Sequence, residues 1–148
     1  MSKERYGVEM SDAEVTSFLE SRGVGTLAFG DEDGAYSIPM SFGYDSVNDR
    51  LVLQMAVGED NRKTRYVEKG NRVSLSAYDW NSIDDWRSVV VQGRLHRVPA
   101  EETSTVAGIF AAHANIASLE VFRQPLDEVE LAWYELRVED IHGRQATP

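Results

Sequence analysis

The sequence contains no cysteine among its 148 residues. This absence excludes disulfides, thiolate nucleophiles and thiolate metal sites. A redox activity would therefore depend on a bound cofactor. No apolar run approaches the roughly 20 residues that a membrane-spanning helix needs, and the segment Met1–Met10 is too polar for a signal peptide. We expect a cytoplasmic protein with no membrane partner.

Lysine is scarce as well, and the chain is strongly acidic. Only 3 of the 15 basic residues are lysines, and 25 Asp and Glu residues give a formal net charge of -10. Such a field repels the phosphate backbone, so we expect no nucleic-acid partner. An acidic excess with few lysines is typical of a halophilic surface, whose internal repulsion is screened in high salt. We therefore expect the protein to lose stability at low salt.

The common catalytic and nucleotide-binding motifs are also missing. His96, His113 and His142 lack the spacing of a metal site. No Gly-x-Ser-x-Gly sequence can seat a nucleophilic serine, and no Gly-x-Gly-x-x-Gly follows a predicted strand. The sequence therefore disfavours a bound metal, a serine hydrolase and a doubly wound parallel sheet.

Hydrophobic periodicity divides the chain into a leading helix and a series of strands. Ser11 and Glu14 form a capping box, which predicts a helix over 12–22. A hairpin is predicted next, with strands at 24–29 and 35–44. The remaining elements are predicted as strands at 51–57, 71–78, 86–98 and 129–141, helices at 64–69 and 99–114, and an irregular segment or brief helix at 119–125.

Antiparallel hairpins dominate this pattern. We expect one domain over residues 1–148, of the mainly β class with some α structure. About six antiparallel strands with peripheral helices favour a closed or partly closed barrel, which removes exposed sheet edges. On the last strand, four side chains are predicted to be buried: Leu131, Trp133, Leu136 and Val138.

A pair of cations opens the short middle helix. Arg62 and Lys63 would lie in its first turn, capped by Asp60 or Asn61, where free backbone N–H groups attract anions. An arginine grips a phosphate at two points, a lysine adds a point charge, and Thr64 supplies a hydroxyl. The pair indicates a phosphate-binding site. The alternative is an ordinary surface pair whose positive charges balance those of neighbouring carboxylates.

Two predicted strands contain residues that are unusual inside a strand. Pro39 interrupts the strand at 36–41, and because proline donates no hydrogen bond, it predicts an edge strand or backbone groups that face a ligand. The stretch 86–95 combines polar residues, an apolar centre and Gly93, which indicates a buried strand with a bulge or a close approach. Neither pattern identifies a function by itself.

Taken in order, three segments resemble the pyridoxamine 5'-phosphate oxidase-like family of FMN-binding split barrels. They are 34–44 with its proline, 61–75 with Asn-Arg-Lys, and 86–93 with Trp-Arg-Ser and Gln-Gly. The resemblance implies a six-stranded antiparallel split β-barrel. It also implies a homodimer, with one FMN in each of two interface clefts to which both chains contribute. The implied function is an oxidoreductase that transfers hydride from a reduced donor to a small acceptor molecule.

The resemblance also implies which residues contact the cofactor. The backbone near 37–41 would line the flavin ring, and the end of the next strand would lie near the ring or the ribityl chain. Arg62 and Lys63 would hold the phosphate, and Ser88 would turn a polar side chain toward the flavin. No catalytic residue is assigned, because the flavin carries the reactive atoms. The expected cofactor-binding residues are Ser37, Ile38, Pro39, Met40, Ser41, Gln54, Met55, Ala56, Arg62, Lys63 and Ser88.

The C-terminal part departs from true pyridoxamine phosphate oxidases. Those resemble one another at a C-terminal Trp and an Arg-Leu-x-Pro segment, whereas this chain reads Ile-His-Gly-Arg-Gln over 141–145. We therefore do not expect vitamin B6 oxidation. Two alternatives stay open on the same barrel. One is an F420-dependent reductase, for which Arg65, Arg72 and Arg94 supply cations, and the other is a non-catalytic flavin-binding module. Relatives also include haem binders, but no histidine matches a haem ligand.

Overall fold

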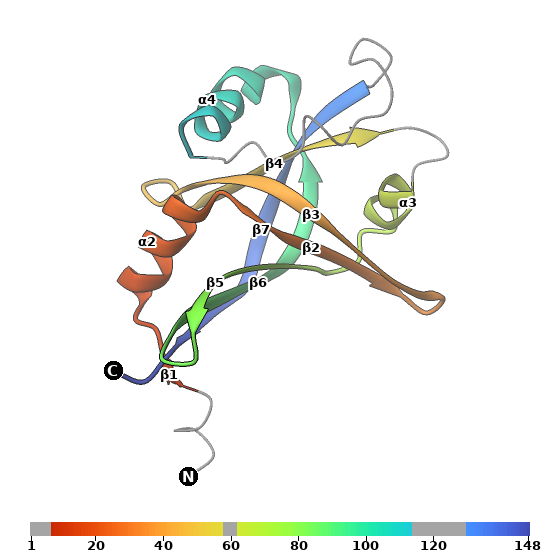
Figure 1. Cartoon of the computed structure of the whole chain (residues 1–148). Helices are drawn as coiled ribbons and strands as arrows, with labels where there is room; N and C mark the ends of the chain where they lie inside the picture. Colours follow the sequence, from red (N-terminus) through yellow and green to blue (C-terminus); the bar gives the residue numbers. More distant parts are fainter. Residues whose placement is uncertain (1–6, 58–61, 114–129) are drawn as a thin grey trace.

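Within the parts that the computed structural model describes, residues 7–57, 62–113 and 130–148, seven strands form one antiparallel sheet that curls into a ring (Figure 1). The spatial order is β1-β7-β4-β3-β2-β5-β6, and β6 pairs with β7 to close the ring. The expected mainly β barrel is confirmed. The strands are β1 Val8–Glu9, β2 Val24–Asp31, β3 Gly34–Asp45, β4 Arg50–Val57, β5 Val73–Ser82, β6 Asp85–Arg97 and β7 Glu130–Gln145.

The described residues contain seven strands rather than the expected six. The additional strand is β1, two residues long, which pairs with the end of β7. It escaped prediction because two residues carry no periodicity. The helices are α2 Asp12–Arg22, α3 Arg62–Glu68, the 3-10 turn η1 Ala100–Glu102 and α4 Thr103–His113. In the ranges described, no helix is long and apolar enough to cross a membrane. The segment predicted at 119–125 and the predicted caps Asp60 and Asn61 lie outside the described residues.

Helix α2 forms as its sequence predicts and covers one end of the barrel. The hydroxyl of Ser11 accepts from the backbone N–H of Glu14 at 3.1 Å, and the Glu14 carboxylate accepts from the N–H of Ser11 at 2.9 Å. Gly23, with φ +67°, ends the helix. The hydrogen bond from the backbone N–H of Ser11 to the Glu14 carboxylate lowers the pKa of Glu14. Phe18 and Leu19 on its inner side are each 1% exposed, so the helix is anchored by burial.

The barrel interior is filled by alternate residues of the strands. Leu27 on β2, Phe42 on β3 and Leu53 on β4 have no exposed surface, and Leu75 and Val91 complete the ring from β5 and β6. Successive side chains of a strand point to opposite faces. The residues between these therefore form the outer surface of the barrel.

The burial predicted for β7 is wrong at Leu131, and Trp133 is partly buried against a smaller core outside the barrel rather than in the main core. Ala132, Tyr134 and Leu136 are the buried residues that face the main core. Leu131 is 37% exposed, and Trp133 lies on the outer face. Because a shift of one residue exchanges the two faces of a strand, choosing the bulkiest side chains gave the wrong parity.

A second, smaller core lies outside the barrel under α4. Val52 and Val106 are fully buried there, and Phe110 meets Trp133 edge to face, with ring centroids 5.2 Å apart. A Cβ at Gly43 would come within 2.9 Å of the carbonyl oxygen of Ile109. This glycine therefore lets α4 lie directly on β3, and it fixes which stretch of the outer surface is covered.

Candidate functional site

The barrel is split between β3 and β4. β3 pairs with β4 only from Phe42 to Asp45, opposite Arg50 to Leu53. Its earlier part, 34–41, pairs with β2 alone, and the later part of β4 pairs only with β7. Among the described strands, none pairs with the two edges that diverge from the Phe42–Leu53 pair. These edges bound an opening in the sheet, as the proline in β3 indicated.

The predicted residues of β3 divide between the two faces of that strand. Ser37 and Pro39 are exposed on the outer surface beside the split. Ile38 and Met40 point inward, where Ile38 packs against the main core and Met40 is buried. Ser41 is buried as well, with 3% exposure. Only the first pair therefore presents side chains to a ligand, although the backbone of the whole run borders the split.

The predicted residues of β4 divide in the same way. Gln54 and Ala56 are half-buried on the outer face, opposite Trp133 and Leu131 of β7. Met55 points into the barrel and is 2% exposed. The split is therefore bordered on this side by an amide and a methyl group, and Met55 can contribute only its backbone.

Helix α3 is held beside the split by stacked aromatic rings. Tyr66 lies parallel to Tyr36 of β3, at 6.4 Å between centroids, and stacks on Phe29 of β2 at 5.8 Å. In Figure 1, α3 lies between the end of β4 and the tip of the β2–β3 hairpin. The backbone of Arg62 and Lys63 begins this helix, so the predicted phosphate residues belong to an element that borders the opening.

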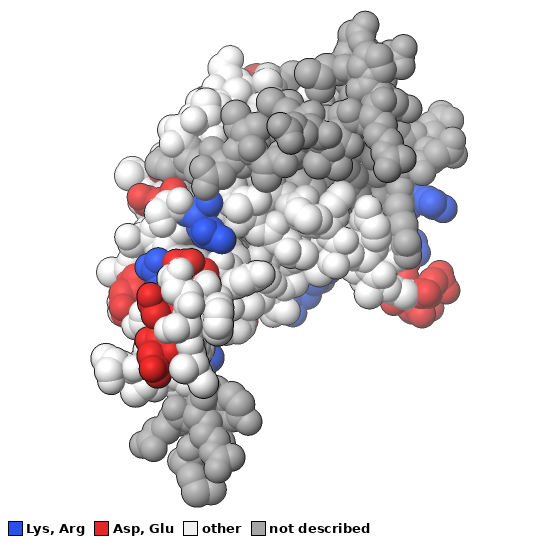
Figure 2. All heavy atoms as spheres, viewed as in Figure 1, with Lys and Arg blue, Asp and Glu red and all other residues white. Residues whose placement is uncertain are grey.

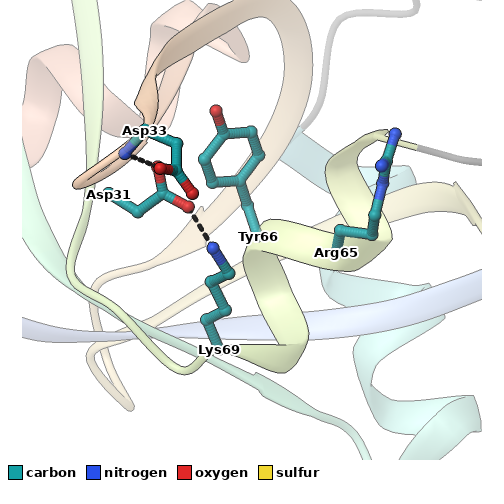
Figure 3. Close-up of a pocket in the computed structure, with 5 residues that line it drawn as sticks. All are labelled: Asp31, Asp33, Arg65, Tyr66 and Lys69. Atoms are coloured by element: carbon teal, nitrogen blue, oxygen red, sulfur yellow. Dashed lines mark hydrogen bonds and ion pairs between the residues drawn. The ribbon is translucent and has the colours of Figure 1, made fainter.

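A cavity of about 210 Å³ separates the end of α3 from the β2–β3 turn. It is lined by Asp31, Asp33, Arg65, Tyr66 and Lys69. Figure 3 shows the ammonium group of Lys69 directed at the carboxylate of Asp31, with which it forms an ion pair, while Arg65 points away. The hydrogen bond from Lys69 lowers the pKa of Asp31, and the same bond raises the pKa of Lys69. Sequence reasoning missed this contact because the two residues are 38 positions apart.

Ser88 lies far from the split within this chain. It pairs with Tyr78 of β5 and with Arg144 of β7. β2 and β5 stand between β3 and β6, so three strand spacings of about 4.8 Å, roughly 14 Å, separate Ser88 from the edge at Pro39. One chain therefore does not bring Ser88 together with the residues of β3 and β4.

A comparison with known protein families identifies the family of this split barrel. The profile of the pyridoxamine 5'-phosphate oxidase family matches residues 11–145. The chain belongs to the pyridoxamine 5'-phosphate oxidase family. The resemblance inferred from Pro39, Arg62 and Lys63 and the strand at 86–93 is therefore confirmed. A search of curated proteins finds no significant match.

Solved structures share the fold over nearly the whole chain. An FAD-binding protein from Mesorhizobium loti is 21% identical, with a TM-score of 0.73 over 94% of this chain and 97% of its own. The FAD-binding protein from Mycobacterium smegmatis is 19% identical, with a TM-score of 0.66 over 94% and 98%. An FAD- and haem-binding protein from the same organism is 13% identical, with a TM-score of 0.66 over 92% and 71%. At such identities the likeness establishes the fold of this family member.

Proposed function

We propose that this protein binds FMN in the split between β3 and β4 and acts as a flavin-dependent oxidoreductase on a small molecule. The observation that carries the proposal is the pair of diverging strand edges, in a member of a family named for an oxidase. The solved structures named as FAD-binding proteins support a flavin of some kind. The cofactor is expected at the interface of a homodimer.

The residues beside the split fit a flavin. Ser37, Pro39, Gln54 and Ala56 are small or uncharged, so they leave room for a flat ring without burying an unpaired charge. Among the described strands, none pairs with 34–41 of β3 or 54–57 of β4 on the side of the split, so a flavin bound there would lie against two strand edges. Arg62 and Lys63 begin α3 and supply the positive charge that a phosphate requires.

The chemistry of the site is divided between the cofactor and the chain. When bound, a flavin supplies two-electron transfer, which no side chain of a cysteine-free chain offers. The described residues of the split contribute binding, orientation and the exclusion of water. Phe42 and Leu53, the last pair that joins β3 to β4 before the split, are both fully buried.

We favour FMN over F420 because two of the three arginines that could hold an acidic cofactor tail are paired within the chain. Arg72 pairs with Glu139 at 2.7 Å, and Arg94 pairs with the same carboxylate at 3.3 Å and donates to the carbonyl of Gly70 at 2.5 Å. Both guanidinium groups are thus engaged within the chain rather than held open for an acidic cofactor tail. FAD is the second candidate, because three of the solved neighbours are named for it.

Removing the two cations tests the proposal. FMN is titrated into the protein while its fluorescence is followed, for the wild type and for Arg62→Ala with Lys63→Ala. We expect the double variant to bind at least about 100-fold more weakly, because it loses two charge-assisted contacts. Arg137→Ala, which removes an exposed arginine from β7, is the control and is expected to bind like the wild type.

Unchanged affinity of the double variant would remove Arg62 and Lys63 from the site. A wild-type protein that ignores both FMN and FAD would overturn the proposed cofactor. If the protein binds flavin but oxidises neither NADH nor NADPH, the non-catalytic module replaces the oxidoreductase.

A further inference from the structure

The scarce lysines of this chain are concentrated around helix α3. Of the three lysines in the sequence, Lys63 lies in the helix and Lys69 directly follows it. Lys69 meets the turn of the β2–β3 hairpin, where residues 31–33 are three consecutive carboxylates. Figure 2 shows the red side chains of this tip close to blue side chains over α3, at the right of the molecule. A cation beside this turn offsets the mutual repulsion of the carboxylates.

The carboxylate of Asp31 is held in place by the hairpin itself. Its Oδ1 accepts from the backbone N–H groups of Asp33 and Gly34, at 2.9 and 3.1 Å. Its Oδ2 faces the ammonium group of Lys69, as Figure 3 shows. The side chain of Asp31 is only 9% exposed, unlike the partners of an ordinary surface ion pair, which contributes little. The ion pair therefore joins Lys69 to a fixed point on the barrel.

Two further contacts join the same segment to the same hairpin. The side-chain amide of Asn71, just beyond α3, donates to the carbonyl oxygen of Gly30 at 3.2 Å. Tyr66 stacks on Phe29 and Tyr36, as described above. With seven residues, α3 is shorter than the roughly 12–15 that an isolated helix needs. Its orientation therefore depends on these contacts with the hairpin.

The ion pair and the proposed phosphate residues lie at opposite ends of α3. Arg62 begins the helix, and Lys69 comes seven positions later. A rise of about 1.5 Å per residue separates their backbones by roughly 10 Å. Side chains that grip a ligand must be placed within about 0.5 Å of the productive geometry. A helix released at its end would therefore lose that placement at its start.

We propose that Asp31 and Lys69 are positioning residues, which hold α3 so that its first turn binds the phosphate of the flavin. The inference rests on the proposed function for the location of that phosphate. A direct contact between Lys69 and the phosphate would have the opposite signature. In that case, removing the charge of Asp31 would free Lys69 and strengthen binding. The positioning role predicts weaker binding, so the Asp31→Asn variant decides between them.

The test is a titration of each variant with FMN and with riboflavin, which lacks the phosphate. Asp31→Asn keeps the oxygen that accepts from the turn, and Lys69→Met keeps the length of the side chain. We expect both to raise the FMN dissociation constant about tenfold and to leave that of riboflavin within about twofold. Lys69→Arg keeps the charge and should restore FMN binding. Arg137→Met removes the same charge from an exposed site on β7 and should bind both flavins like the wild type.

FMN affinity that is unchanged or tighter in Asp31→Asn would overturn the inference. Equal weakening of FMN and riboflavin would also overturn it, because the pair would then support the whole barrel.

Hydrogen exchange of the flavin-free protein separates this inference from the proposed function. The amides of 62–68 should exchange faster in Asp31→Asn than in the wild type, because α3 has lost one of its contacts. Equal exchange in the two proteins would show that the ion pair does not hold the helix. A wild type that binds neither flavin, with faster exchange in the variant, would overturn the proposed function and leave only the anchoring of α3.

Discussion

The two sides of the barrel differ in how completely their strands are paired. On the closed side, β7 pairs with β6 from Arg87 to Arg97 and with β4 from Leu51 to Val57. On the split side, β3 and β4 share only four residue pairs. The side chain of Arg50 adds to the closed side by reaching the carboxylates of Glu135 and Glu102, at 2.6 and 3.2 Å.

This difference in strand pairing indicates that stability and ligand binding depend on different sides of the barrel. A strand paired on both edges is enclosed by its neighbours, whereas in the described part of the chain no second strand lies against 34–41 or 54–57. We infer that the closed side holds the barrel together while the split side serves the cofactor. Substitutions on the two sides should therefore alter different measurements.

The largest effect is expected at Gly93 on the closed side. A Cβ at this position would lie 1.9 Å from the carbonyl oxygen of Arg137, at the bulge between β6 and β7. Gly93→Ala should lower the free energy of unfolding by at least about 4 kcal/mol, measured by urea denaturation. Gly30→Ala on the split-side hairpin is the control, since its Cβ meets nothing closer than 3.8 Å. Equal stability of the two variants would show that the closed side has no special role.

An intermediate effect is expected at two neighbouring residues of β4. Met55→Ala should lower the free energy of unfolding by about 3 kcal/mol, because its side chain is buried in the main core. Gln54→Ala should leave stability within about 0.5 kcal/mol and raise the FMN dissociation constant several-fold. Denaturation and FMN titration of both variants measure the contrast. A Gln54→Ala variant that changed the free energy of unfolding and left the FMN dissociation constant unaltered would refute the contrast.

The smallest effect is expected at Tyr44, away from the split. Its hydroxyl donates to Asp49 at 2.8 Å, and burial, followed by this bond, raises the pKa of the phenol from 10.0 to about 12. The neutral phenol is therefore favoured in the folded state, so its contribution is complete below pH 10 and is lost as the pH rises toward 12.

Tyr44→Phe should consequently cost about 1 kcal/mol at neutral pH. The difference from the wild type should shrink above pH 10, as followed by denaturation at a series of pH values. FMN affinity should not change. A difference that stays constant up to pH 11.5, roughly the upper part of the titration range, would contradict this assignment of the tyrosine.

Local features of the chain were predictable from sequence, and contacts between distant segments were not. The capping box at Ser11 and the proline at position 39 act through their immediate neighbours, so the helix and the strand edge at the split followed from them. The ion pair of Lys69 with Asp31 depends on how α3 settles on the hairpin, which no local pattern encodes. The location of Ser88 outside the split depends on the order of the strands in the sheet, in which β2 and β5 separate β3 from β6.

Hydrogen exchange with and without FMN tests the central claim most directly, because it reads the two sides of the barrel in one experiment. The account predicts that FMN slows the exchange of backbone amides in 34–41 and 54–57, and leaves 131–138 on β7 unchanged. Protection confined to β7, or none in either edge of the split while flavin is bound, would contradict it.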